Sequence, residues 1–130
     1  MYKRQSYSNR IKQQWLNVSE QSLLEEGAVS KAVVEQMAAG ALADSGADIA
    51  VAVSGIAGPD GGTDEKPVGT VWIAWGFKGK IRASKYFWPR ERIAFQSMVT
   101  LIALDLIRRE VLGLDTQRCH FADFRKKVQA

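Results

Sequence analysis

The sequence has little of what builds disulfide-linked or metal-stabilised proteins. Its 130 residues contain one cysteine, Cys119, and one histidine, His120. A single cysteine cannot form an internal disulfide, and these two side chains are too few for an ordinary zinc site. A disulfide-stapled secreted domain is therefore excluded. We expect no metal, no cofactor, and a reducing compartment, the cytoplasm.

Long apolar runs and low-complexity segments are also missing. No apolar run approaches the ~18 residues that cross a membrane, and residues 1–6 lack the apolar region of a signal peptide. Three prolines and eleven glycines rule out a collagen-like chain. The 46% hydrophobic and 25% charged residues are typical of one globular domain, for which we expect no membrane partner.

Positive charge is in modest excess, with a formal net charge of +4. The excess lysines and arginines collect near the two ends, in residues 3–12 and 118–127. No basic run is interleaved with aromatic residues, so solvated chain ends explain the charge and we expect no nucleic-acid partner.

Hydrophobic spacing and capping residues predict a mixed α/β order. We expect helices over about 10–17, 20–26, 30–45 and 90–112, and strands over 48–53, 70–75 and 81–88. Lys78-Gly79-Lys80 predicts a hairpin turn between the last two strands. The continuous apolar run 48–53 predicts a strand buried on both faces. We interpret residues 114–130 as a partly ordered tail.

A glycine-rich segment leaves the end of the first predicted strand. It runs from Ser54 to Gly69 and includes Gly55, Gly58, Gly61 and Gly62. Neither the Walker A nor the G-x-G-x-x-G spacing is present. Functional crevices of α/β sheets lie at strand carboxyl ends, where glycine N–H groups can bind anions. Composition alone leaves a tight structural turn and a phosphate or oxyanion site as alternatives.

Three segments together carry a resemblance to a known family. They are S-G-I-A-G-P-D-G-G-T with E-K-P-V-G-T-V over 54–71, Y-S-N-R-I-K over 7–12, and E-G-A-V-S over 26–30. The chain resembles the CinA C-terminal domain family over residues 6–113, which includes the nicotinamide-nucleotide amidases. The resemblance implies a three-layer α/β/α sandwich of that type, missing its first strand and helix.

The resemblance also implies a chemistry. The family hydrolyses the carboxamide of nicotinamide mononucleotide to nicotinate mononucleotide and ammonia, in pyridine nucleotide salvage. It uses a serine–lysine pair and no metal, with the serine in an N-terminal S-C-T-G-G motif. This sequence contains no S-C-T-G-G, so we expect the chain as given to be an inactive fragment. A missing strand would leave an open sheet edge, and we expect an unstable or homo-oligomeric protein.

The family's functional positions carry over residue by residue. Lys12 matches its catalytic lysine, Tyr7 its tyrosine, and Ser54 a serine or threonine at the head of the glycine loop. The loop glycines are expected to bind the oxyanion or phosphate. Arg90 matches an arginine of a G-D-R stretch, but Trp88-Pro89 replace Gly-Asp here, which leaves Arg92 as an alternative.

Several alternatives stay open. Without the resemblance, Lys12 would be a solvated helix lysine and Ser54 a turn cap. Lys66 is expected to be a solvated loop lysine and is the next candidate base. Residues 1–5 have no counterpart in the family and are interpreted as translated adapter sequence. The rival function is a non-catalytic nucleotide-binding or interaction module.

Overall fold

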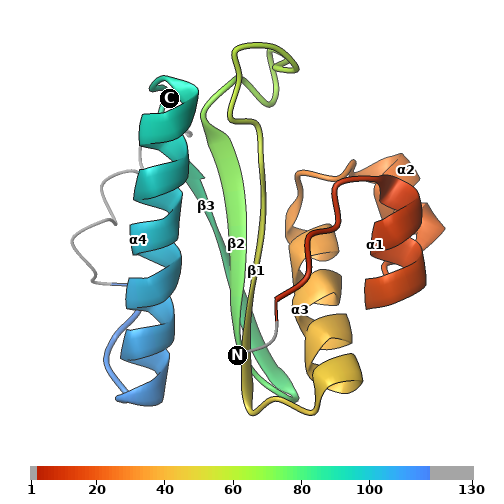
Figure 1. Ribbon diagram of the computed structural model, residues 1–130, viewed down its shortest axis with the longest axis vertical. Coiled ribbons are helices and arrows are strands. Elements are labelled where there is room, and N and C mark those ends of the chain that lie inside the picture. Colours follow the sequence, from red (N-terminus) through yellow and green to blue (C-terminus); the bar gives the residue numbers. More distant parts are fainter. Residues whose placement is uncertain (1–2, 118–130) are drawn as a thin grey trace.

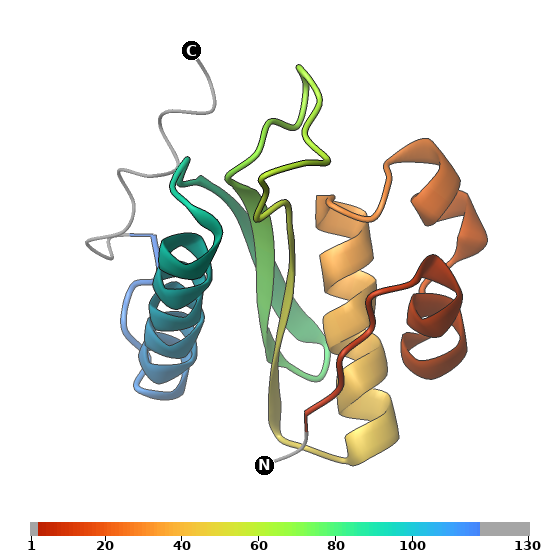
Figure 2. The same cartoon turned by 45° about the horizontal axis from the view of Figure 1, so that its top comes forward.

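The computed structural model describes residues 3–117, which form three layers (Figure 1). A sheet lies in the middle, with three helices on one face and the fourth on the other, as the turned view also shows (Figure 2). The order is α1 (Asn9–Leu16), α2 (Glu20–Glu25), α3 (Lys31–Ser45), β1 (Ile49–Gly55), β2 (Thr70–Phe77), β3 (Lys80–Phe87) and α4 (Arg92–Val111). The predicted α/β/α sandwich is thereby confirmed.

The sheet is antiparallel, with the order β1-β2-β3. Phe77 pairs with Lys80, so Lys78 and Gly79 form the predicted tight turn. The central strand β2 is the one buried on both faces. The expectation that 48–53 is buried on both faces was wrong. In β1 only Ala52 is fully buried and Val53 is 39% exposed, because β1 is the edge strand within residues 3–117.

Two apolar clusters occupy the two faces of the sheet. On one face Val71, Ile73 and Trp75 of β2 pack against α4. On the other face Ala52 of β1 and Ala74 of β2 join a cluster with α1, α2 and α3. Side chains alternate between the faces of a strand, so β2 supplies both cores and holds the layers together.

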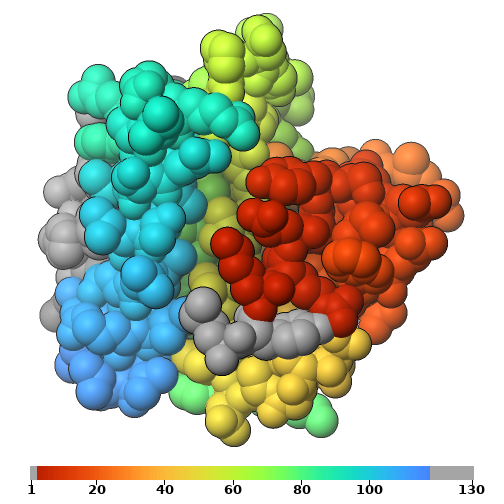
Figure 3. Space-filling model, in the orientation of Figure 1, coloured from red at the N-terminus to blue at the C-terminus, as the bar shows by residue number. Residues whose placement is uncertain are grey.

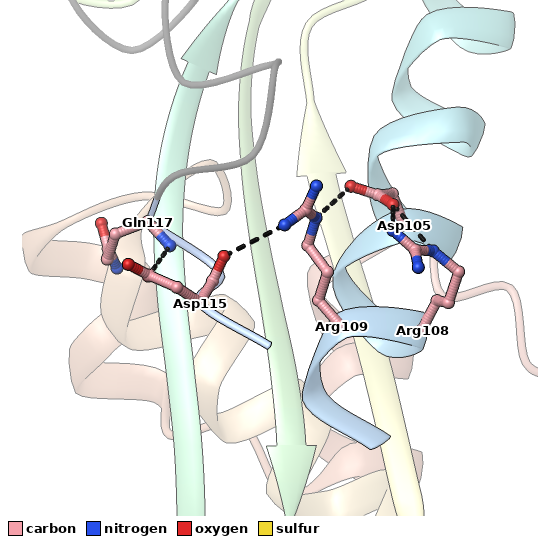
Figure 4. Close-up of polar contacts among 5 residues, drawn as sticks. All are labelled: Asp105, Arg108, Arg109, Asp115 and Gln117. Carbon is pink, nitrogen blue, oxygen red and sulfur yellow. Dashed lines mark hydrogen bonds and ion pairs between the residues drawn. The ribbon is translucent and has the colours of Figure 1, made fainter. Parts of the chain in front are cut away.

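The end of α4 is fixed by charged side chains (Figure 4). Arg109 donates from Nε to Asp105 Oδ2 at 2.8 Å and from Nη1 to the Asp115 carbonyl at 3.3 Å. Arg108 donates to the other carboxylate oxygen, Oδ1. Burial raises the pKa of Asp105, but the hydrogen bonds from Arg109 and Arg108 outweigh it and leave that pKa below its usual value.

The segment before α1 runs along the α3 side of the sheet. In the space-filling view it lies opposite α4, with β1 visible between them (Figure 3). Arg4 forms an ion pair with Asp44 of α3 at 2.6 Å and lies over the ring of Trp15. Arg4 thus contacts the fold, although it lies in the segment interpreted as adapter sequence. That interpretation of residues 1–5 stays a prediction.

Helix α1 packs closely on α3 at Gly40. A Cβ atom there would lie 2.0 Å from the carbonyl oxygen of Leu16. Glycine lowers helix propensity inside a helix, but here the missing side chain permits the contact between the helices. Lys12 and Leu16, four residues apart on α1, are its buried residues and share one face.

We expect Gly40→Ala to lower the free energy of unfolding by at least about 2 kcal/mol, despite alanine's better helix propensity. The clash is with backbone, so no rotamer change relieves it. Ala39→Ser, at an exposed position of the same helix, is the matched control and should change stability little. Urea titrations of both variants measure the difference. Equal stability of the two variants would contradict the close approach of the helices.

Candidate active site

The sequence-predicted residues gather at one end of the sheet. There β1 ends, the glycine-rich loop projects beyond the strands, and α1 and α3 begin (Figure 1). Ser8 caps α1, with its Oγ accepting from the Ile11 N–H at 3.2 Å. Ser30 caps α3 in the same way through the Val33 N–H. Both caps use the short polar side chains that favour helix starts.

Lys12 is buried, with 5% of its surface exposed. Its Nζ donates to the carbonyl oxygens of Ser6 at 2.5 Å and Tyr7 at 3.2 Å. It makes no ion pair with a carboxylate within residues 3–117. Burial of the charged group lowers the pKa of Lys12 below its ordinary value. The structure thus places Lys12 in an environment unlike that of a solvated helix lysine.

Tyr7 and Ser54 lie at the same end but do not contact the Lys12 amino group with their side chains. The Tyr7 side chain is exposed, at 81%, and its carbonyl is the group that Lys12 meets. Ser54 donates from Oγ to the Ala28 carbonyl at 2.8 Å. That bond ties the end of β1 to the turn before α3.

The glycine-rich loop is shaped by its glycines. Gly58 and Gly61 have φ of 74° and 93°, a region that favours glycine. A Cβ at Gly62 would lie 2.7 Å from the Val68 backbone nitrogen. The N–H groups of Gly58, Gly61 and Gly62 donate to no acceptor in the described part of the chain. Gly61 and Gly62 are exposed, so their N–H groups are open to an anionic group, whereas Gly58 is buried.

Two arginines follow β3 and have different partners. Arg90 lies over the Trp88 ring, 5.2 Å from its centroid, and its guanidinium makes no hydrogen bond within residues 3–117. Arg92 donates from Nη1 to the Gly58 carbonyl at 3.1 Å. Helix α4 begins two residues later than predicted, because the Glu91 carboxylate caps it through the Ala94 N–H.

Lys66 is not the solvated loop lysine expected from the sequence. Its Nζ donates to the Glu26 carbonyl, in the turn before α3. It also lines a hollow of about 360 Å³ on the α3 side of the sheet, together with Trp72 and Lys85. The sequence analysis used E-G-A-V-S over 26–30 only for the family resemblance and missed that its carbonyls accept hydrogen bonds from Ser54 and Lys66. Every residue has a backbone carbonyl, so residue types do not show which carbonyl accepts a hydrogen bond.

Trp75 of β2 packs in the apolar cluster against α4. Trp75 is fully buried and donates from Nε1 to Glu110 of α4 at 3.1 Å.

Within residues 3–117, no group of three or more potential metal-binding side chains occurs. No helix of that range is both long and apolar enough to cross a bilayer. Cys119 and His120 lie outside the described residues.

The chain belongs to the CinA C-terminal domain family, whose model matches residues 5–111. Among curated proteins it is 56% identical over 100 residues to a CinA-like protein of Akkermansia muciniphila, covering 76% of this chain and 24% of that protein. It is 46% identical over 108 residues to the nicotinamide-nucleotide amidohydrolase PncC of Enterobacter agglomerans, covering 82% of this chain and 66% of that enzyme.

Solved structures support the same family assignment. The competence/damage-inducible protein A of Klebsiella pneumoniae matches with a TM-score of 0.73 and 40% identity, over 76% of this chain and 62% of that one. A competence/damage-inducible protein of Agrobacterium tumefaciens matches with a TM-score of 0.75 and 38% identity, over 78% of this chain and 62% of that one. The chain spans about a quarter of the length of the CinA-like proteins it matches.

The burial of Lys12 predicts a pH dependence of stability. The folded state releases the Lys12 proton at a lower pH than the unfolded state, whose pKa is about 10.4. Between the pKa of Lys12 in the folded state and its pKa in the unfolded state, the unfolded state binds more protons. The free energy of unfolding therefore rises with pH across that window. We expect the stability of the wild type relative to Lys12→Met to rise across that window.

Urea titrations from pH 7 to pH 10.5 measure this difference. Lys31→Met, at a side chain that is 59% exposed, is the control and should differ from the wild type by a constant amount. A constant difference for Lys12→Met as well would show that Lys12 is not desolvated.

Proposed function

We propose that the chain is part of an amidase that converts nicotinamide mononucleotide and water to nicotinate mononucleotide and ammonia, in pyridine nucleotide salvage in the cytoplasm. The observation that carries the proposal is the burial of Lys12 against two carbonyl oxygens without a carboxylate partner. The similarity to the nicotinamide-nucleotide amidohydrolase of Enterobacter agglomerans supports the choice of substrate class.

The environment of Lys12 suits a general base. A neutral lysine has two N–H donors and one lone pair, and the Ser6 and Tyr7 carbonyls engage the two donors. The lone pair is then left to accept the proton of a serine hydroxyl as its oxygen attacks the carboxamide carbon. A neighbouring carboxylate would favour the charged form of the lysine. None pairs with Lys12 within residues 3–117.

The remaining residues supply donors for a charged substrate. The free N–H groups of Gly58, Gly61 and Gly62, with Gly55 at the loop's base, would bind the oxyanion or the phosphate. Arg90, stacked on Trp88, would grip the phosphate. The exposed Tyr7 phenol would hydrogen-bond the nucleophile. Ser54 donates its single hydroxyl hydrogen to Ala28, so it would orient the lysine or donate towards the substrate only after releasing that carbonyl.

The proposed nucleophile is not among the 130 residues, which contain no S-C-T-G-G. We therefore expect no ammonia release by the purified chain at rates typical of an enzyme, since loss of a nucleophile costs several orders of magnitude. Placing the N-terminal segment of the Enterobacter agglomerans enzyme before residue 6 should create activity. Enzyme-coupled ammonia detection measures both. Turnover by the unextended chain would contradict the serine–lysine mechanism.

In the extended protein Lys12 and Arg90 should affect different kinetic constants. Lys12→Ala should lower kcat by at least ~10² with little change in KM, because a general base acts in the transition state. Arg90→Ala should raise KM more than it lowers kcat, if Arg90 binds the phosphate. Activity should rise with pH through the lowered pKa of Lys12, since only neutral lysine accepts a proton.

Two outcomes would contradict this assignment. Near-normal kcat in Lys12→Ala would place the base elsewhere. An extended protein that unfolds cooperatively and binds nicotinamide mononucleotide but releases no ammonia would favour the rival function, a nucleotide-binding module.

A further inference from the structure

The glycine-rich loop is attached to the fold by two cationic side chains. Lys66, within the loop, donates to the Glu26 carbonyl before α3. Arg92, at the start of α4, donates to the Gly58 carbonyl within the loop. The two bonds reach opposite helical layers, so the loop is held from both sides of the sheet.

No other hydrogen bond within residues 3–117 joins residues 57–66 to the rest of the fold. The base of the loop is closed by backbone bonds from the Ile56 N–H to the Thr70 carbonyl and from the Gly69 N–H to the Ile56 carbonyl. Beyond that base, the hydrogen bonds of Thr63 and Lys66 to each other stay within the loop. The position of the loop's tip therefore depends on Lys66 and Arg92.

Neither cation forms an ion pair within residues 3–117. Each makes a charge-assisted bond to a neutral carbonyl, which is stronger than a bond between neutral groups. Glu25, Glu26 and Glu65 line the same hollow as Lys66 without pairing with it. The loop's free glycine N–H groups lie in the segment that these cations hold. An anion bound there would meet donors already in place, and less ordering would be needed on binding.

We propose that Lys66 and Arg92 are positioning residues that clamp the glycine-rich loop between the two helical layers and so fix its N–H groups for an anionic substrate. The clamp itself is independent of the chemistry, whereas its effect on the substrate rests on the proposed amidase function. In this role Lys66 holds the loop in place and takes no proton from the nucleophile, whereas Lys12 is the proposed general base.

The clamp is tested on the 130-residue chain by limited proteolysis. A protease that cuts after acidic residues can attack Asp60, Asp64 and Glu65 in the loop. We expect Arg92→Met and Lys66→Met to raise the rate of loop cleavage roughly tenfold, while Lys66→Arg, which keeps a donor, stays near the wild-type rate. Urea titration confirms that each variant is folded under the assay conditions.

The matched controls remove a nearby cation whose side chain makes no hydrogen bond between the loop and the rest of the fold. Lys85→Met removes a lysine from the same hollow as Lys66, and Arg90→Met removes the arginine two residues before Arg92. Both should be cleaved at the wild-type rate. Cleavage of the Lys66 and Arg92 variants at the control rates would overturn the clamp, whether or not the protein is an amidase. If Lys66→Met fails to fold, Lys66→Gln and Arg92→Met carry the test.

The consequence for the substrate is tested in the extended protein. A loosened loop should raise KM for nicotinamide mononucleotide by roughly tenfold to a hundredfold, the usual effect of misplaced binding groups, with a smaller fall in kcat. Lys66→Arg should restore KM. A fall in kcat with unchanged KM, as expected for Lys12→Ala, would make Lys66 a base and overturn the positioning role. If the extended protein shows no activity, the proteolysis result still decides the clamp.

Discussion

The burial of the Lys12 amino group is the constraint on which the rest of the site depends. Lys12 and Leu16 share the buried face of α1, and Leu16 meets α3 at Gly40, where no side chain intervenes. That close approach buries the lysine. Its acceptors, the Ser6 and Tyr7 carbonyls, belong to the turn that leads into the helix. One local segment, docked on one glycine, therefore creates a lysine whose charged form is disfavoured.

Backbone carbonyls, rather than carboxylates, organise this end of the fold. Lys12, Ser54, Lys66 and Arg92 each donate to a carbonyl oxygen, and none of the three cations among them forms an ion pair in the described residues. A carbonyl satisfies a donor but does not cancel its charge. The acidic partners that neutralise arginines elsewhere, as at Asp105, are absent from these contacts. The hydrogen-bonding capacity of these side chains is thus met by backbone, while Glu25, Glu26 and Glu65 line the same hollow as Lys66 without a direct ion pair to it.

Sequence patterns predicted the helices and the hairpin because these follow from local periodicity and turn chemistry, and the family resemblance predicted the three layers. They misjudged β1, since an apolar run such as 48–53 reports hydrophobicity but not which strand becomes central. The central strand is β2, which pairs with β1 on one side and with β3 on the other. The motif resemblance indicated Lys12, Ser54 and the glycine loop. It could not indicate the partners of Lys66 and Arg92, because every residue carries a carbonyl.

The replacement of the family's Gly-Asp by Trp88-Pro89 bears on which arginine would meet the phosphate. The Trp88 ring lies under the guanidinium of Arg90, where a cation–π contact can hold it without using its N–H donors. Those donors remain free for bidentate contact with phosphate oxygens. Arg92 has already placed one donor on Gly58. Trp88 therefore orients Arg90 without occupying its donors, which fits the proposed phosphate contact, and Arg92 is the arginine proposed to support the loop. The two arginines suit different tasks because one is oriented by a ring and the other by a carbonyl.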